Sequence, residues 1–128
     1  MGVSEHCLSL AADVMLVDND VDGSEALADL LQYRGYSVAR TSNGSEALNY
    51  LKRFSRPRVI ILDLLMPVMD GPEFLEHQSS DPALLDIPVV ILTGTPPLRP
   101  LPAKAILLKP VHPKELFEII ERFLPAEP

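Results

Sequence analysis

The strongest constraint on the fold is a rhythm of short apolar runs separated by longer segments with a helical spacing of apolar residues. The runs that we expect to be strands are 14–17, 36–41, 59–62, 88–93 and 105–108. Strands that alternate with helices pair in parallel, because each crossover helix returns the chain to the same edge of the sheet. Several runs are apolar throughout, which is typical of strands buried on both faces. The sequence therefore predicts an α/β fold with a doubly wound parallel sheet.

Capping residues mark the helix boundaries. The first helix is expected to begin at Asp20 or Asp22, whose side chains can accept hydrogen bonds from free backbone N–H groups, and to end at Gly35. Pro72 fits the first turn of the third helix, where a backbone N–H has no partner to lose. The last helix has apolar residues at i, i+4, i+7 and i+8: Leu116, Ile120, Phe123 and Leu124. Such helices would cover both faces of the sheet.

Composition narrows the class of protein. The chain has 128 residues, of which 47% are hydrophobic and 23% charged, as expected for one soluble domain. Its formal net charge of -7 argues against binding to nucleic acid or to an anionic membrane. Cys7 is the only cysteine, so no intrachain disulfide can form and a reducing compartment fits best. We expect a loose lead-in over residues 1–12 and a single domain over 13–125.

Polar side chains stand where the predicted strands end. They are Asp18, Asn19 and Asp20 after the first strand, Asp63 after the third, Thr93 at the end of the fourth and Lys109 after the fifth. In open parallel sheets, ligands bind beyond the carboxyl ends of the strands. The sequence therefore predicts that oxygen ligands, a hydroxyl and an ammonium group meet at one edge of the sheet.

Taken singly, each of these residues has a plainer interpretation. Asp18 and Asp20 could cap a helix, and Asp63 could start a turn. Thr93 could be ordinary strand content, and Lys109 could be a solvated strand end. Their joint occurrence at successive strand ends favours the functional interpretation over the separate structural ones.

Five segments in order carry a resemblance to a known family: Val17–Asp20, Ile61–Pro67, Met69–Gly71, Ile87–Gly94 and Leu108–Pro110. Together they resemble the receiver domain of bacterial response regulators, over about Val14 to Leu124. The resemblance implies a five-stranded sheet in the order 2-1-3-4-5, the flavodoxin-like arrangement. It also implies two-component phosphorelay signalling in the bacterial cytoplasm, Mg²⁺, and a histidine kinase or phosphotransfer protein as donor.

The resemblance assigns a role to each polar residue at the strand ends. Asp63 would be the phospho-acceptor, while Lys109 and Thr93 would contact phosphoryl oxygens. The implied Mg²⁺ ligands are all oxygens: Asp18, Asn19, Asp63 and the backbone carbonyl of Leu65. The Lys109-Pro110 bond would be cis. We expect a phospho-acceptor rather than a turnover enzyme, because the sequence has neither a Gly-rich phosphate loop nor a nucleophile–base pair.

Single residues depart from the family pattern. Asn19 replaces the second acid, which removes a negative charge, so we expect weak Mg²⁺ binding. Ile106 stands where the family usually has a Tyr or Phe that changes its orientation. Leu65 replaces a polar side chain that helps to hold the hydrolytic water, so an acyl phosphate on Asp63 should be long-lived.

The segment 94–103, between the fourth and fifth strands, departs as well. It is short for a helical crossover, and it carries prolines, which cannot donate a backbone hydrogen bond inside a helix. The prolines are Pro96, Pro97, Pro100 and Pro102. We therefore predict a Pro-rich loop in place of the family's fourth helix, with Leu98 and Leu101 packed down to cover the sheet.

These departures leave two hypotheses of different classes. One is a stand-alone phospho-acceptor that signals to an unknown downstream protein. The other is a degenerate receiver that acts as a phosphorylation-independent protein-interaction module. A homodimer is compatible with both.

Overall fold

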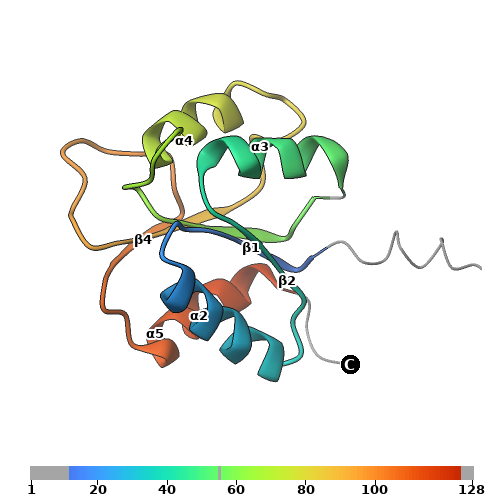
Figure 1. Cartoon of the computed structure of the whole chain (residues 1–128), viewed down its shortest axis with the longest axis vertical. Coiled ribbons are helices and arrows are strands. Elements are labelled where there is room, and N and C mark those ends of the chain that lie inside the picture. The colour runs from blue at the N-terminus through green and yellow to red at the C-terminus, as the bar shows by residue number, and fades with distance from the viewer. Residues whose placement is uncertain (1–11, 55, 125–128) are drawn as a thin grey trace, which may run out of the picture.

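A parallel sheet forms the centre of the molecule, as the computed structural model shows for residues 12–54 and 56–124 (Figure 1). Its strands are β1 (Val14–Val17), β2 (Val38–Thr41), β3 (Val59–Leu62), β4 (Val89–Thr93) and β5 (Ala105–Leu108). The five strands lie in the order β2-β1-β3-β4-β5, which confirms the predicted topology. Strands β2 and β4 begin later than predicted: Val38 pairs with the first residue of β1, and Pro88 has no N–H to donate.

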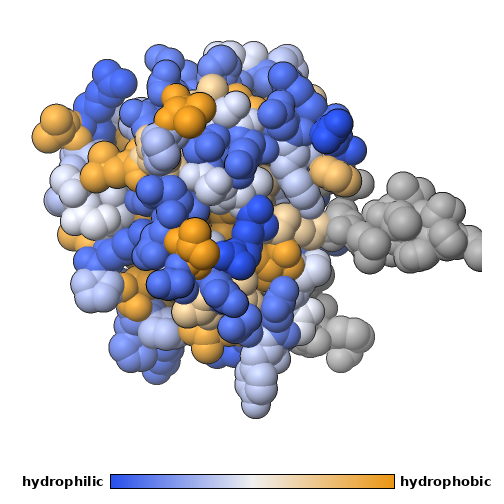
Figure 2. Space-filling view, in the orientation of Figure 1, coloured by the Kyte–Doolittle hydropathy of each residue, from blue (hydrophilic) through white to orange (hydrophobic). Residues whose placement is uncertain are grey.

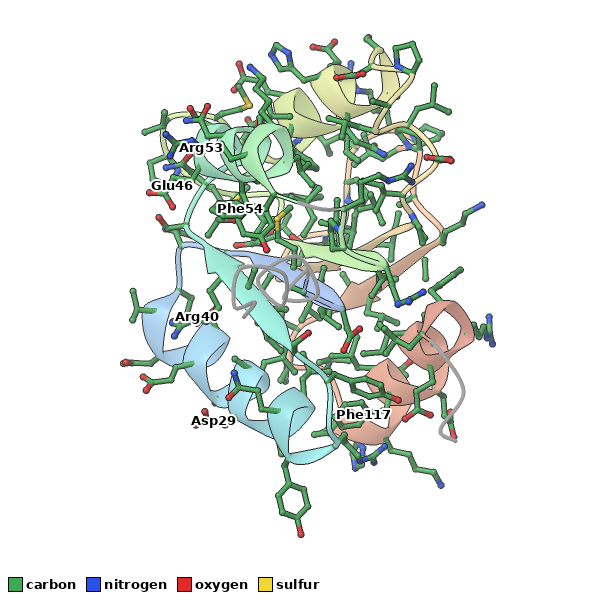
Figure 3. The ribbon with its side chains drawn as sticks, turned by 90° about the vertical axis from the view of Figure 1, so that its right-hand side faces the viewer. Asp29, Arg40, Glu46, Arg53, Phe54 and Phe117 are labelled. Atoms are coloured by element: carbon green, nitrogen blue, oxygen red, sulfur yellow. The ribbon has the colours of Figure 1, made fainter. Side chains whose placement is uncertain are left out.

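Helices cover both faces of this sheet. They are α2 (Val21–Tyr33), α3 (Gly44–Arg53), α4 (Gly71–Ser79) and α5 (Pro113–Ile120), followed by the 3₁₀ turn η1 (Glu121–Phe123). Figure 3 shows α3 and α4 on one side of the sheet and α2 and α5 on the other, with Phe117 in the second layer. No helix in the described part of the chain has the length and apolar character needed to span a membrane.

Each helix layer packs on its own hydrophobic cluster. Val14 and Leu16 of β1 face the α2 and α5 side, whereas Met15 and Val17 face the α3 and α4 side. This is the period of two expected of a strand. The central strands β1, β3 and β4 are buried along their whole length, which confirms the prediction of a sheet covered on both faces. Figure 2 shows the hydrophobic residues of the viewed surface as separate groups among hydrophilic ones.

Caps and one glycine set the limits of α2. Of the two predicted caps, Asp20 is the one observed: its side chain accepts a hydrogen bond from Gly23 N at 3.2 Å. Gly35 follows the helix with φ +96, a conformation that favours glycine, as predicted. The last predicted helix is shorter than expected, because α5 ends at Ile120 and its apolar pattern continues through η1.

The segment 94–104 contains no helix and no strand. Leu101 is half-buried and packs on the α3 and α4 cluster, as expected. The expectation for Leu98 is wrong, because this side chain is fully exposed. Leu98 lies at a bend where the chain turns back toward β5, so its side chain projects from the loop instead of packing down. The predicted lead-in over 1–12 lies, apart from Ala12, outside the described residues.

Candidate functional site

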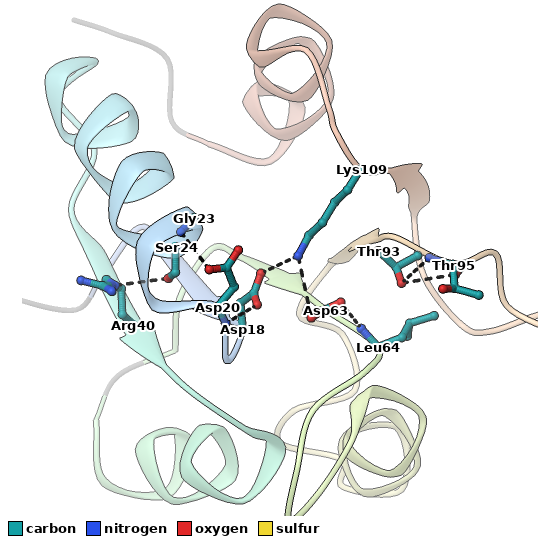
Figure 4. Close-up of polar contacts among 10 residues, drawn as sticks. All are labelled: Asp18, Asp20, Gly23, Ser24, Arg40, Asp63, Leu64, Thr93, Thr95 and Lys109. Carbon is teal, nitrogen blue, oxygen red and sulfur yellow. Dashed lines mark hydrogen bonds and ion pairs between the residues drawn. The ribbon is translucent and has the colours of Figure 1, made fainter.

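Asp18, directly after β1, links two parts of the carboxyl edge of the sheet (Figure 4). Its Oδ1 accepts a hydrogen bond from the backbone N of Asp20 at 2.9 Å, and its Oδ2 accepts one from Lys109 Nζ at 2.9 Å. The first bond fixes the turn into α2. The second holds the lysine from the far side of the sheet over the site.

Asp63 follows the buried strand β3, and its side chain is held inside the edge. The residue is only 8% exposed. Its backbone N donates to Val17 O at 2.9 Å, and its Oδ1 accepts from Leu64 N at 2.8 Å. This bond anchors Oδ1, while Oδ2 lies 3.8 Å from Lys109 Nζ.

Lys109 is positioned by the end of β5. Its backbone N donates to Thr93 O at 2.8 Å, which extends the pairing with β4 by one residue. The bond from Lys109 to Pro110 is cis, as the resemblance implied. Its ammonium group reaches both Asp18 and Asp63, so one cation faces two carboxylates.

The charges at this edge shift the pKa values of two groups. Burial, and after it the negative charge of Asp18, raises the pKa of Asp63, against the opposing effects of Lys109 and of the backbone hydrogen bonds from Leu64 and Leu65. Burial disfavours the ammonium of Lys109, but the hydrogen bond and charge of Asp18, with Asp63 and Asp20, outweigh it and raise the Lys109 pKa. The site thus holds more negative charge than its lysine compensates.

Thr93, the last residue of β4, is completely buried at the same edge. Its hydroxyl donates to Thr95 O at 3.2 Å and accepts from Thr95 N at 3.4 Å. The hydroxyl therefore anchors the first residues of the Pro-rich loop.

The remaining predicted site residues are less clearly placed. Asn19 and the side chain of Leu65 are both exposed. Asp20 is engaged in capping α2, although its charge still reaches Lys109. Across the described residues, no group of three or more His, Cys, Asp or Glu side chains could hold a metal ion. The structure thus brings together Asp18, Asp63 and Lys109, with Thr93 at the neighbouring strand end.

Gly71 is a positioning residue that we did not single out from the sequence. A Cβ at this position would stand 2.7 Å from Asp63 O and from Leu64 Cα, so only glycine lets α4 approach the loop that follows β3. Its N–H donates to Leu64 O at 2.9 Å. The Met69-Asp70-Gly71 segment could have predicted this role, because a helix that begins close to the end of a strand requires a small residue at the contact.

Comparison with known families identifies the family of this chain. The model of the response regulator receiver domain matches residues 14–121. The chain belongs to this family. Receiver domains act in two-component signal transduction, and they are phospho-acceptor modules rather than turnover enzymes.

Similar proteins and structures agree with the fold. The polar-differentiation response regulator DivK of Brucella anthropi is 31% identical over 117 residues, covering 87% of this chain and 94% of that protein. The signal receiver domain of a signal transduction histidine kinase from Syntrophus aciditrophicus is 30% identical with a TM-score of 0.79, covering 89% and 90% of the two chains.

Other matches are partial or more distant. The chain spans about half the length of some curated relatives, such as the probable transcriptional regulator ycf29 of Pyropia yezoensis, which is 33% identical and 52% covered, over 87% of this chain. The receiver domain of the sensor histidine kinase PA1611 from Pseudomonas aeruginosa PAO1 has a TM-score of 0.79 at 22% identity, covering 88% of this chain and 97% of that one. That structure has a magnesium ion coordinated in its active site cleft.

Proposed function

We propose that the chain accepts a phosphoryl group on Asp63 from a histidine kinase or a phosphotransfer protein. One observation carries the proposal: a carboxylate only 8% exposed ends the central strand β3 with an ammonium group, that of Lys109, 3.8 Å away. An anion kept out of water beside a cation is suited to attack an anionic phosphoryl group, since the cation offsets the repulsion between them.

In the proposed transfer, an Asp63 oxygen forms a bond to phosphorus while the bond from phosphorus to the donor imidazole nitrogen breaks. The nitrogen keeps the electron pair of the broken bond, and the product on this chain is an acyl phosphate. Asp63 Oδ1 is held by Leu64 N, so Oδ2, on the side of Lys109, is the oxygen that we assign as nucleophile. Lys109 and the Thr93 hydroxyl then bind phosphoryl oxygens.

The oxygen-only donor set at this edge fits Mg²⁺, which prefers hard oxygen ligands. The residues that would hold it are Asp18, Asn19, Asp63 and the backbone carbonyl of Leu65. Bound Mg²⁺ would neutralise part of the charge on the carboxylates and on the phosphoryl oxygens. Burial and the charge of Asp18 already raise the pKa of Asp63, so an added positive charge is electrostatically favourable there. Asn19 brings no charge, and we therefore expect weak affinity.

We further propose that the Pro-rich loop takes the place of a helix found in other receivers and that it limits the response to phosphorylation. Prolines fix the backbone angle φ, which stiffens the segment 94–103. Ile106 is partly exposed on β5 and cannot act as an aromatic switch. Changes on activation should therefore remain near Asp63 and Thr93, and α2 and α5 are the expected partner surfaces.

The decisive experiment is incubation with acetyl phosphate and Mg²⁺, read by intact mass. A species heavier by about 80 Da, one phosphoryl group, should form on the native chain. It should be absent from Asp63→Asn and present in Asp29→Asn, which changes an exposed acid of α2 outside the carboxylate cluster. A modification that persists in Asp63→Asn would show that another residue is the acceptor.

A second candidate function is favoured by Asn19, which leaves the site short of an acid. The chain would then be a receiver fold that binds proteins without being phosphorylated. Failure of acetyl phosphate to modify the chain, together with partner binding unchanged in Asp63→Asn, would select this alternative. Under either function we propose a cytoplasmic location and an as yet unidentified downstream protein.

A further inference from the structure

Two features of the carboxyl edge lie beside the proposed phosphoryl site. One is the tip of the Pro-rich loop, residues 97–100, which follows β4. The other is a cavity of about 480 Å³ between α2 and α5, which we call the α2/α5 cavity. Both lie at the edge where β1, β3, β4 and β5 end, and Figure 1 shows the loop and the starts of α2 and α5 on the same side of the molecule.

The loop tip is an exposed apolar knob with a positive charge beside it. Leu98 is fully exposed, which leaves a large apolar side chain in water. Arg99 is exposed too, and within the described chain its guanidinium has no ion-pair partner. Prolines at 97 and 100 limit the conformational entropy that this tip would lose on binding.

The α2/α5 cavity is an apolar hollow that lies over the core. Its accessible walls are Leu27 and Leu30 of α2 and Val111 before α5, and the buried side chains beneath them are Leu16, Ile61 and Leu116. The two helices are joined at their far ends, where Arg34 pairs with Glu121 at 2.9 Å and lies 4.0 Å over the Phe117 ring. Asp18, Asp63 and Lys109 also line the cavity, so it extends to the carboxyl edge.

The mouth of this cavity is acidic. Asp18, Asp20 and Asp63 all line it, and Lys109 is the cation among them. Three carboxylates against one ammonium leave a formal charge of about -2 when all are ionised. A partner that fills the cavity should therefore carry an apolar side chain next to a positive charge, which is what the loop tip presents in Leu98 and Arg99.

We infer that a second copy of this chain occupies the cavity, with Leu98 of each protomer inserted between α2 and α5 of the other and Arg99 at the acidic mouth. Because knob and hollow lie on the same edge of one molecule, a two-fold axis can satisfy both contacts at once, and the assembly closes as a dimer. In that dimer the loop tips cover both Asp63 residues. The inference does not require Asp63 to be phosphorylated.

Sedimentation velocity over a concentration series tests the dimer. We expect a monomer–dimer equilibrium with a dissociation constant in the micromolar range at low salt. Leu98→Asp should raise that constant at least 100-fold, because it removes both insertions per dimer. The matched control is Leu85→Asp, an equally large exposed side chain that lies before the amino end of β4, and it should leave the constant within about twofold.

Substitutions that fill the cavity test the other half of the proposed contact. Leu30→Trp places a larger side chain at the partly exposed rim, and Val111→Phe does the same from the α5 side, so a folding defect in one leaves the other as a test. Either should weaken the dimer at least tenfold. A mixture of Leu98→Asp and Leu30→Trp retains one intact contact, so heterodimers should form more readily than either variant self-associates.

Charge gives an independent measurement. Arg99→Glu should raise the dissociation constant at least tenfold and reverse its salt dependence, whereas Arg53→Glu on the exposed side of α3 should not. A monomer at every concentration up to about 1 mM would overturn the inference. So would a dimer indifferent to Leu98→Asp, or a species that grows beyond the dimer, because open growth excludes the reciprocal contact.

Discussion

The two faces of the sheet support the carboxyl edge in different ways. On the α3 and α4 face, α4 packs directly against the loop after β3: Phe74 is fully buried, and Gly71 allows α4 to touch the Asp63 loop. The buried Gln78 amide also donates to Leu84 O at 2.7 Å and to Ile87 O at 3.3 Å. On the α2 and α5 face, a cavity lies beside the same residues. One face holds the Asp63 loop by close packing, and the other leaves room for a partner.

The largest difference between the faces should appear in core truncations. Leu75→Ala, on the α3 and α4 face, should lower the free energy of unfolding by about 2–5 kcal/mol, because the buried site cannot collapse around the lost methyl groups. Leu27→Ala, beside the α2/α5 cavity, should cost about 1 kcal/mol, because part of that side chain already faces open space. Urea denaturation measures both, and equal losses would remove the distinction between the faces.

Glycine substitution sharpens the comparison at the loop that follows β3. Gly71→Ala should destabilise the protein by about 1–3 kcal/mol, since the new Cβ collides with backbone atoms of Asp63 and Leu64 that cannot easily shift. Gly94→Ala is the control, because nothing lies within 4 Å of a Cβ there. Unfolding free energies that are equal in the two variants would mean that the close approach of α4 is unimportant.

The prediction for Mg²⁺ concerns Asn19, an exposed residue at the carboxyl edge of the sheet. Asn19→Asp adds one negative charge at a proposed Mg²⁺ ligand and should tighten Mg²⁺ binding by about tenfold, or 1.4 kcal/mol. Asn49→Asp adds the same charge on an exposed position of α3 and should leave the affinity unchanged. Calorimetric titration compares the two, and an affinity that does not rise in Asn19→Asp means that Asn19 is not a ligand.

Asp63→Asn should stabilise the protein by about 1 kcal/mol at pH 7. Burial and Asp18 raise the folded-state pKa of Asp63, so its ionised form is a cost to the folded state at neutral pH. The cost disappears as pH falls through this raised pKa toward the value in the unfolded chain, because the carboxyl becomes protonated. The unfolding free energies of the native chain and of Asp63→Asn should therefore differ at pH 7 and converge near pH 4. A difference between the two proteins that grows toward acid would contradict this sign.

Much of this arrangement could be predicted from the sequence because it depends on short-range rules. The strand ends at Val17, Leu62 and Leu108 were predicted where they are observed, since each apolar run stops at a charged residue. The contact of Lys109 with Asp18 was not foreseen, although both residues were placed at the same edge. A parallel sheet fixes which strand ends meet but not which side chains pair across them.

Other features depend on long-range spacing that no local pattern records. Leu98 and Leu101 have the same apolar character, yet only Leu101 packs on the core. The bend at Leu98 decides between them. The α2/α5 cavity likewise depends on how far apart two helices stand, and Arg34 links them at their far ends.

The Thr93 hydroxyl has a single hydrogen, and that hydrogen is already used. It is donated to Thr95 O, at the start of the Pro-rich loop. If an oxygen of a phosphoryl group on Asp63 takes this hydrogen, Thr95 O must find another donor. The carbonyl would then be free to exchange with water, and the loop would lose a tether at its first residues while its prolines keep their shape. A phosphoryl group on Asp63 would thus loosen the hydrogen bond that attaches the loop to β4, while the conformation of the loop stays the same.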